Sequence, residues 1–548
     1  MNKFSALQRK TIQKTLQSEE FDLIIIGGGI TGAGIALDAS SRGMKVALVE
    51  KNDFASGTSS KSTKLIHGGL RYLKQFDFWL VKEVGSERAI VHKLAPHLVI
   101  PEKMILPLIK DGTYGTWLTS IGLKIYDILA NVEGDDKRKM LNKEQALKLE
   151  PLLPKEILEG AGFYAEYRTD DARLTIEVLK TALNYKTTAL NYCEVTDFIY
   201  TDNRISGVRV KDHINAKEFT IAAKYVINAA GAWVDELRQI NKSKTGKRLH
   251  LTKGVHLVFP HKKLPVKHAI YFDIPDGRMM FAIPRGKITY VGTTDTNYQD
   301  DKDNIDTTTV DALYLISAVN NMFPDIELTL KDVISSWAGV RPLIHEEGKS
   351  ASELSRKDEI FVSDTELISI AGGKLTGYRK MAERVIDLVC KKYAKRFDKK
   401  FMDIQTHDLT LIGGNFKNFK EVIKYQDTIY KQLKEVGFRK IDANYLVYNY
   451  GTQTDVILKK FNQLKDEDVK IKLAKAELWF CFNYEMIENP SDFFIRRTGR
   501  LYFDIDSVHH LKVPIIEEFA KLLDWDISTK TIQAKNLEDA FFKATQFS

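Results

Sequence analysis

The residues with the clearest chemical potential form a glycine pattern near the N-terminus. Gly27, Gly29 and Gly32 have the spacing G-x-G-x-x-G and directly follow the apolar run FDLIII. In this spacing the first glycine permits a tight turn, the second lets the backbone approach a pyrophosphate, and the third lets a helix pack closely on a strand. Ile30 and Thr31 open that helix, whose first N–H groups and dipole favour bound phosphate. The pattern predicts a dinucleotide site, for FAD or NAD alike.

An acidic residue ends the next apolar run, MKVALVE. Glu50 lies 18 residues after Gly32, where a carboxylate can accept hydrogen bonds from the ribose hydroxyls of an adenosine. Lys51 follows it and is expected to contact the cofactor too. The alternative, a tight turn without a ligand, is disfavoured because strand, helix and acid are all in register.

Hydroxyl, cationic and glycine residues crowd the following stretch, GTSSKSTKLIHGG, at residues 57–69. Such a loop can line the pyrophosphate and ribityl chain of an extended flavin cofactor. A solvated Ser/Thr loop is the alternative, although two glycines beside a histidine indicate close approach of the backbone to another group. The residues expected to contact the flavin here are Thr58, Ser59, Ser60, Lys64, Leu65, His67 and Gly68.

A second glycine-rich turn, AGGKLTGYRKMA at residues 371–382, precedes a helical pattern. By the same helix-terminus argument it can bind an anion or a carbonyl oxygen. A plain helix start without a ligand is an equal alternative. The apolar run KYVINAAGAW, residues 224–233, likewise ends in small residues. The cofactor contacts expected from these two segments are Ala229, Gly231, Gly373, Lys374, Leu375 and Thr376.

Candidate substrate groups are scattered along the chain: Arg71, His256 in KGVHLVFP, Arg341 in AGVRPLI, and Lys374. The planar fork of an arginine suits phosphate, and a histidine near neutrality suits proton abstraction from an alcohol. Taken singly, each has a commoner structural role, so only their convergence in the fold would assign them to a substrate. No HExxH, Walker A or nucleophile-elbow motif occurs, and no metal site is expected.

The elements that must position these residues are predicted to be a parallel sheet carrying a separate antiparallel sheet. Residues 21–50 predict a strand, a helix and a strand. The run RMMFAIPRGKITYVGTTD predicts a hairpin that turns at PRGK. Residues 76–150 are expected to be mainly helical. The basic run at 391–400 marks a boundary, after which only helices with polar connections are expected.

Composition narrows the classes of function. The 548 residues, 44% hydrophobic and 28% charged, suit a globular protein of more than one domain. The net charge of +8 favours anionic substrates or an anionic membrane surface, while the lack of aromatic–basic stripes argues against nucleic acid. Three cysteines without a CxxC fit a reducing compartment. No apolar run approaches the ~18–20 residues that span a bilayer, so membrane contact is expected from one side.

Taken in order, these motifs resemble the FAD-dependent glycerol-3-phosphate dehydrogenases. The run IGGGITGAGIALDASSRG resembles that family's first flavin signature, GGKLTGYRKMA its second, and DFFIRRTGRLYFD its C-terminal domain. The resemblance implies an α/β fold (α+β overall), with a Rossmann-like FAD domain of the glucose-oxidase or D-amino-acid-oxidase type. The implied domains are an FAD domain within 1–395 (20–90, 150–240 and 335–395), an inserted antiparallel-sheet substrate domain (91–149 and 241–334), and a C-terminal helical cap domain (396–548).

The resemblance also implies FAD as cofactor and oxidation of sn-glycerol 3-phosphate to dihydroxyacetone phosphate. Electrons would pass to a membrane quinone. The protein would be cytoplasmic and attached peripherally to the inner face of the membrane. The sequence also allows a homodimer, with a second copy of the chain as partner. By similarity Arg71, Tyr72, Arg341 and Lys374 would hold the substrate, with His256 near the reacting hydroxyl. His256, Arg341 and Lys374 would be the catalytic set.

Three alternatives remain open at this point. The first is an α-glycerophosphate oxidase that uses O₂ and releases H₂O₂, although this chain lacks the extra internal segment of that branch. The second is an amino-acid oxidase of the same fold, which would not call for three cationic groups. The third is a non-catalytic flavin-binding protein that attaches to polyanions or membranes through its basic charge.

Overall fold

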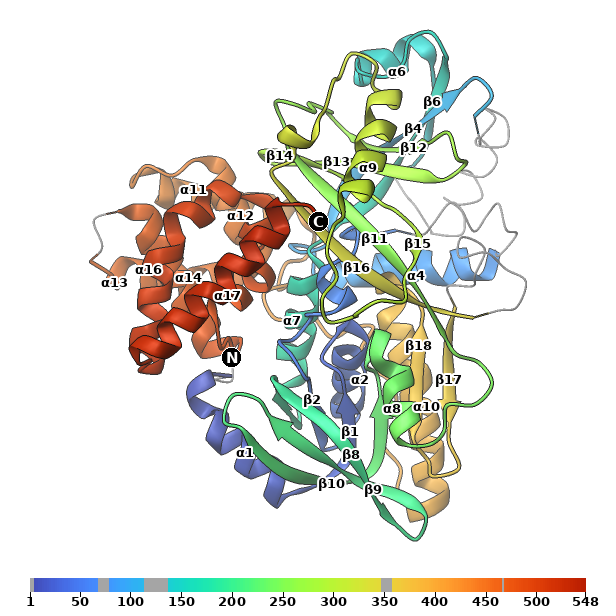
Figure 1. Ribbon diagram of the computed structural model, residues 1–548, viewed down its shortest axis with the longest axis vertical. Helices are drawn as coiled ribbons and strands as arrows, with labels where there is room; N and C mark the ends of the chain where they lie inside the picture. Colours follow the sequence, from blue (N-terminus) through green and yellow to red (C-terminus); the bar gives the residue numbers. More distant parts are fainter. Residues whose placement is uncertain (1–3, 68–77, 113–136, 346–356, 466–467) are drawn as a thin grey trace.

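The computed structural model describes residues 4–67, 78–112, 137–345, 357–465 and 468–548 (Figure 1). It confirms the predicted strand, helix and strand: β1 (Glu20–Ile26), α2 (Ile30–Ser41) and β2 (Val46–Val49), with β1 parallel to β2. The apolar run of β1 is buried because helices and loops cover both faces of a parallel sheet. The chain leaves α2 at Gly43, whose φ of +99° favours glycine.

The first sheet is parallel at its centre and has eight strands among the described residues. Its main path is β17 (Asp358–Val362), β18 (Ile368–Gly372), β10 (Lys217–Asn228), β1, β2 and β7 (Thr187–Leu190), and β8 (Cys193–Thr201) and β9 (Arg204–Asp212) extend it beside β10. Helix α2 lies against this sheet between α7 (Asp171–Ala182) and α10 (Tyr378–Phe397). The carboxyl ends of β1, β2, β10 and β18 therefore meet at one edge.

The second sheet has ten strands among the described residues and is antiparallel apart from the parallel pair β12 and β4. Its strands are β15 (Thr296–Asn297), β11 (Leu249–Pro260), β14 (Ile288–Gly292), β13 (Met279–Arg285), β12 (Ala269–Asp273), β4 (Ile100–Ile109), β6 (Leu158–Arg168) and β3 (Leu65–Ile66), with β16 (Ser335–Ile344) beside β11 and β5 (Lys139–Asn142) beside β6. The predicted hairpin at PRGK is confirmed by β13 and β14, which turn at Gly286 with φ +65°.

The prediction that residues 76–150 are mainly helical is wrong for residues 100–109 and 139–142, while residues 76–77 and 113–136 lie outside the described residues. Helices α4 (Phe78–Leu94) and α6 (Lys143–Leu149) form, but residues 100–109 form β4 and residues 139–142 form β5. Strand β4 pairs on both sides, with β6 and β12, so its apolar run is buried without a polar alternation. A short apolar run of this kind does not distinguish strand from helix by periodicity.

The two sheets divide the chain at different residues from those expected. Strands β3, β6 and β16 belong to the second sheet, whereas their residues fall within the ranges expected for the FAD domain, 20–90, 150–240 and 335–395. The basic run at 391–400 is mostly the end of α10, where Lys395 and Arg396 lie in the last turn and complement the helix dipole. The division into three domains remains a prediction.

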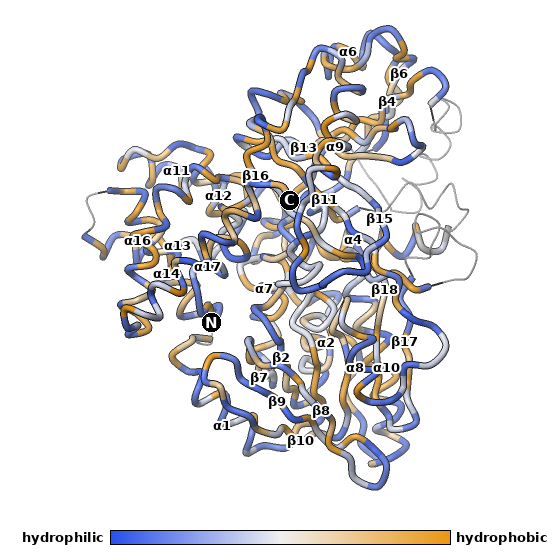
Figure 2. The backbone as a smooth tube through the Cα atoms, in the orientation of Figure 1, coloured by the Kyte–Doolittle hydropathy of each residue, from blue (hydrophilic) through white to orange (hydrophobic). Residues whose placement is uncertain are grey.

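The C-terminal region forms a helical lobe beside the two sheets (Figure 1). Its longer helices are α11 (Phe419–Lys434), α12 (Lys440–Tyr450), α13 (Thr454–Gln463), α14 (Val469–Tyr484), α16 (Ile505–Leu523) and α17 (Ile527–Thr545). Figure 2 shows apolar residues recurring between hydrophilic ones along these helices, the pattern of helices that bury one face. Among the described helices none is long and apolar enough to cross a membrane.

Candidate active site

Glycines let the turn between β1 and α2 pass close to its neighbours. Gly27 has φ +112°, and a Cβ on it would lie 2.6 Å from the Ala229 carbonyl oxygen. A Cβ on Gly32 would overlap the Gly27 carbonyl oxygen, and a Cβ on Gly29 would meet Ser59 Oγ at 3.0 Å. The backbone of this turn therefore forms a cradle that larger residues would fill.

Glu50 is already held by backbone donors. Its Oε2 accepts the Gly28 N–H at 2.7 Å and its Oε1 accepts the Asn52 N–H at 2.9 Å. Burial raises the pKa of the Glu50 carboxyl, and the two N–H groups oppose that rise by stabilising the charged form. Since each carboxylate oxygen has a second lone pair, Glu50 can still accept hydrogen bonds from ribose hydroxyls.

The hydroxyl-rich loop divides between the cavity and the protein interior. Ser59 Oγ accepts the Ile30 N–H at 2.9 Å and so orders the first turn of α2, while the Thr58 hydroxyl donates to the Val340 carbonyl at 2.7 Å. Lys64 is buried, donates to the Ser60 carbonyl at 3.1 Å and forms an ion pair with Asp171 at the start of α7. Ser60 and Lys64, both expected at the cofactor, thus anchor the loop and do not line the cavity.

A cavity of about 330 Å³ is lined by both glycine-rich turns. The expected residues on its wall are Gly27, Gly29, Ile30, Thr31, Glu50, Lys51, Thr58, Ser59, Leu65, His67, Ala229, Gly231, Arg341, Gly373, Lys374, Leu375 and Thr376. Gly32 acts by packing beneath the first turn. Gly68, Arg71 and Tyr72 lie outside the described residues. The fold thus brings together segments that are far apart in the sequence.

Arg341 and Lys374 are two of the cationic side chains on this wall. Arg341, on β16, is oriented by three acceptors: its Nη1 donates to the Thr294 carbonyl at 3.1 Å and to Asp295 Oδ1 at 3.2 Å, and its Nη2 donates to Thr293 Oγ1 at 2.7 Å. Lys374 follows β18 and precedes the short helix η6 (Leu375–Gly377). Paired cations in a cavity favour an anionic ligand.

His256 lies on β11, one side chain behind the wall. Its Nε2 is 3.0 Å from Thr63 Oγ1, and its ring stacks on Trp337 with centroids 4.8 Å apart. Thr63 lines the cavity, whereas His256 is only 1% exposed. Burial, followed by the charges of Arg341 and Lys64, lowers the pKa of His256 well below its ordinary value. The imidazole is therefore neutral at pH 7 and able to accept a proton.

Some cavity residues were missed by reasoning from sequence. Trp233 lines the wall and lies under Lys51, whose Nζ is 4.5 Å from the ring centroid. Trp233 is the last residue of the run KYVINAAGAW. Lys61, which belongs to the predicted hydroxyl-rich loop, lines the wall too, and burial lowers its pKa to about 8. Val195 comes from β8, and nothing in the sequence marks that strand as a neighbour of Glu50.

The residues present fit FAD. A pyrophosphate fits the glycine cradle, Glu50 has lone pairs for a ribose, and an extended flavin dinucleotide accounts for a second glycine turn on the same cavity. Among the residues that the structure describes, no group of three or more His, Cys, Asp or Glu is placed to hold a metal ion.

Family models and curated relatives agree with this site. The model described as FAD dependent oxidoreductase matches residues 22–372, and the C-terminal domain of alpha-glycerophosphate oxidase matches residues 404–530. The aerobic glycerol-3-phosphate dehydrogenase of Bacillus subtilis (strain 168) is 48% identical over 539 residues, 98% of this chain and 97% of that protein. That of Staphylococcus haemolyticus (strain JCSC1435) is 48% identical over 545 residues, 99% and 98% of the two chains.

Solved structures give the same result. The glycerol-3-phosphate dehydrogenase from Bacillus halodurans, complexed with FAD, has a TM-score of 0.84 and 42% identity, covering 99% of this chain and 98% of that one. The L-alpha-glycerophosphate oxidase from Mycoplasma pneumoniae with FAD bound, at 20% identity and a TM-score of 0.55, covers 70% and 96% and supports the fold alone. The predicted fold class is confirmed. The chain belongs to the family of FAD-dependent glycerol-3-phosphate dehydrogenases.

Proposed function

We propose that the protein oxidises sn-glycerol 3-phosphate to dihydroxyacetone phosphate and passes the electrons to a quinone. The observation that carries the proposal is the placement of Arg341 and Lys374 on the same cavity as both flavin-binding turns. A phosphorylated alcohol needs a cationic clamp, a base and a hydride acceptor held alongside. The names of the full-length relatives support the same substrate.

Arg341 and Lys374 would bind the phosphate and oxygens of the substrate, together with Arg71 and Tyr72. Arg341 is suited to this role because Thr293, Thr294 and Asp295 orient its guanidinium. Bound FAD supplies the acceptor for the hydride that leaves C2. FAD would be held by Gly27, Gly29, Glu50 and the second glycine turn.

His256 would take the proton of the C2 hydroxyl through Thr63. The substrate proton passes to Thr63 Oγ1 while the proton of that hydroxyl passes to His256 Nε2, 3.0 Å away. The C2 carbonyl forms as the C2–H bond breaks, so the substrate loses a hydride from C2 and a proton from the hydroxyl, two electrons and two protons in all. Burial lowers the pKa of His256, so the imidazole is neutral before the reaction and releases the proton readily after it.

With a quinone as acceptor, the protein would be cytoplasmic and attached to the inner face of the membrane. A second copy of the chain would be a further partner, forming a homodimer. Relatives named as dehydrogenases align over 97–98% of their own lengths, which supports a dehydrogenase. The second candidate is an oxidase that releases H₂O₂, because residues 404–530 match the C-terminal domain described for alpha-glycerophosphate oxidase.

The experiment compares two acceptors with one substrate. Purified holoenzyme is given sn-glycerol 3-phosphate either under nitrogen with a water-soluble quinone or in air without quinone. We expect dihydroxyacetone phosphate to form in step with quinone reduction, and little peroxide in air. Peroxide equal to the ketone formed would identify an oxidase. Absence of dihydroxyacetone phosphate under both conditions would overturn the proposal.

A further inference from the structure

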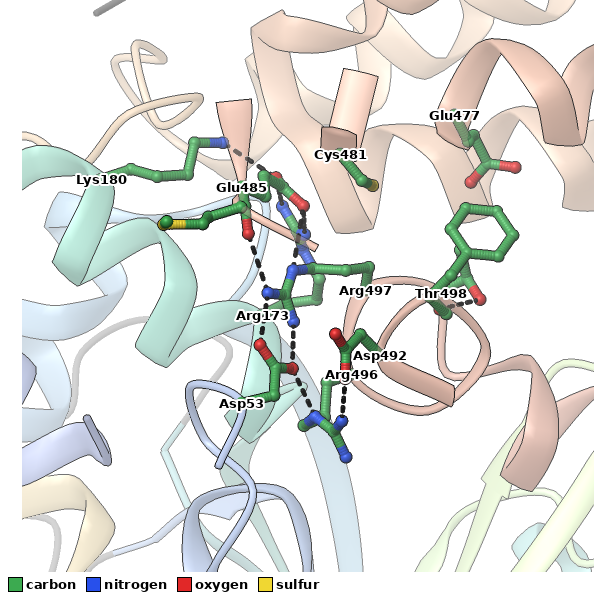
Figure 3. A network of polar contacts seen from close by, with 12 residues as sticks. Asp53, Arg173, Lys180, Glu477, Cys481, Glu485, Asp492, Arg496, Arg497 and Thr498 are labelled. Carbon is green, nitrogen blue, oxygen red and sulfur yellow. Dashed lines mark hydrogen bonds and ion pairs between the residues drawn. The ribbon is translucent and has the colours of Figure 1, made fainter. Parts of the chain in front are cut away.

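A buried carboxylate joins residues 50–59, the part of the FAD-binding loop that directly follows β2, to the C-terminal lobe. Asp53, three residues after Glu50, is 0% exposed. Its Oδ2 accepts from Arg496 Nε at 2.5 Å and from Arg497 Nη1 at 2.8 Å, and its Oδ1 accepts from Arg497 Nη2 at 2.9 Å (Figure 3). Asn191 Nδ2 donates to Oδ1 at 3.2 Å. Two consecutive arginines from the C-terminal lobe thus hold one side chain of the flavin loop.

The segment that carries Asp53 also shapes the first flavin turn. The Ala55 N–H donates to the Gly28 carbonyl at 3.0 Å, while Glu50 accepts the Gly28 N–H at 2.7 Å. The Phe54 ring is buried so close to Gly28 that a Cβ there would lie 2.6 Å from it. A shift of Asp53 would therefore move groups on both sides of Gly28, in the middle of the glycine cradle.

The arginines are themselves fixed from within the lobe. They end the π-helical turn η8 (Asp492–Arg497), in which Asp492 accepts from Arg496 Nη2 at 2.5 Å. Arg497 Nη2 also donates to the Glu485 carbonyl at 2.8 Å. Because Arg497 is fully buried, losing either partner of its pair with Asp53 would unbalance the charges of a buried network that also includes Arg496 and Glu485.

We propose that Arg496 and Arg497 position the FAD-binding loop through Asp53, so that FAD binding and docking of the C-terminal lobe stabilise each other. Coupling of this kind is reciprocal: whatever docking contributes to FAD affinity, bound FAD contributes to docking. The inference rests on FAD binding and does not depend on the substrate or the electron acceptor.

The same interface offers a matched control that leaves the flavin loop alone. Glu177, on α7, accepts from Arg173 Nη2 at 2.5 Å and from Lys180 Nζ at 3.2 Å (Figure 3 shows Arg173 and Lys180). Gln453 of the lobe donates to the same Glu177 oxygen at 3.1 Å. Glu177 is as buried as Asp53, and its hydrogen bonds come from Arg173, Lys180 and Gln453 and not from residues 50–59.

The experiment compares Asp53→Asn with Glu177→Gln in the holoenzyme. FAD release at 25 °C is followed by the rise in flavin fluorescence on dilution, and thermal midpoints are recorded in parallel. Both substitutions are expected to lower the thermal midpoint, because each removes one charge from a buried network. Only Asp53→Asn is expected to speed FAD release, by a factor within the ~5–150-fold range typical of coupling between sites.

A second variant covers the case in which Asp53→Asn does not fold. Arg496→Gln leaves Arg497 in place, and we expect it to speed FAD release by a smaller factor. Hydrogen exchange adds a readout of the reverse effect: bound FAD should slow exchange at residues 485–497 in the wild type, and less so in Arg496→Gln. Equal FAD release from the Asp53→Asn or Arg496→Gln variant and the Glu177→Gln control would overturn the proposal, because it would make the network purely structural.

Discussion

Thr63 gives the buried His256 its route to the cavity. The hydroxyl lies on the cavity wall and is 3.0 Å from the imidazole Nε2, while Trp337 stacks on the ring. A histidine placed in this way is protected from solvent yet one hydroxyl from a substrate. Proton transfer by a positioned side chain is typically worth ~10²–10⁴-fold in rate.

Thr63→Val removes this hydroxyl and nearly preserves shape. We expect the rate of flavin reduction by glycerol 3-phosphate in a single turnover to fall about 10²-fold or more, because the proton loses its relay to His256. FAD affinity should be unchanged, and Thr63→Ser should restore most of the rate. A Thr63→Val enzyme that reduces its flavin at the normal rate would show that His256 does not act through this residue.

The sequence predicts which residue types form the flavin loop, but it does not predict which of them face the cavity and which face the protein interior. Ser59 and Lys64 both belong to the predicted loop, but Ser59 caps α2 at the cavity while Lys64 pairs with Asp171 inside the protein. The difference depends on Asp171, more than a hundred residues later in the chain. A local motif carries no information about such a distant partner.

The turn between β1 and α2 tolerates no side chain at Gly32. A Cβ there would overlap the Gly27 carbonyl oxygen, which is backbone and cannot rotate away. Gly377 provides the contrast: its φ is −88° and a Cβ would have nothing within 4 Å. The two glycines belong to the first and second glycine-rich turns, respectively.

Gly32→Ala should destabilise the protein by ~1–3 kcal/mol, the usual cost of overpacking, and should release FAD during purification. Gly377→Ala should be neutral or stabilising by up to about 1 kcal/mol, because it only restricts the unfolded chain. The measurements are the FAD-to-protein ratio from absorbance and the thermal midpoint. Full FAD occupancy in Gly32→Ala would contradict the close packing described here.

Elements with a long, local signal were predictable, and those defined by pairing were not. The glycine fingerprint fixed β1, α2 and β2 because their periodicity and turn residues are contiguous. Strand β4 was missed because its burial comes from β6 and β12, about 60 and 165 residues away in the sequence. The edges of the second sheet depend on the same long-range pairing.

A buried histidine links the stability of the whole molecule to pH. His97 is 0% exposed, and burial together with Arg173 and Lys180 lowers its pKa to about 3. The unfolded chain takes up a proton near pH 6.5 at this residue, whereas the folded protein does not. Because of His97, the free energy of unfolding therefore decreases as the pH is lowered below 6.5, by ~1.4 kcal/mol per pH unit.

His97→Leu should remove this dependence. We expect the stability of the wild type relative to His97→Leu to decline steadily from pH 6.5 to pH 5. Comparing the two proteins isolates His97, because burial raises the pKa of Glu488 to about 7 and of Asp38 to about 6 in both, and those carboxyls act in the opposite direction. A difference in thermal midpoints that does not change with pH would mean that His97 is protonated in the folded protein.

The proposed function requires one event, transfer of the C2 hydrogen of a phosphorylated alcohol to FAD in the cavity lined by Arg341 and Lys374. The direct test is anaerobic stopped-flow reduction of the flavin with sn-glycerol 3-phosphate and with the same substrate deuterated at C2. We predict bleaching of the flavin band, slower with the deuterated substrate, and no bleaching by unphosphorylated glycerol at the same concentration. A flavin that stays oxidised with glycerol 3-phosphate, or that glycerol reduces equally well, would contradict the account.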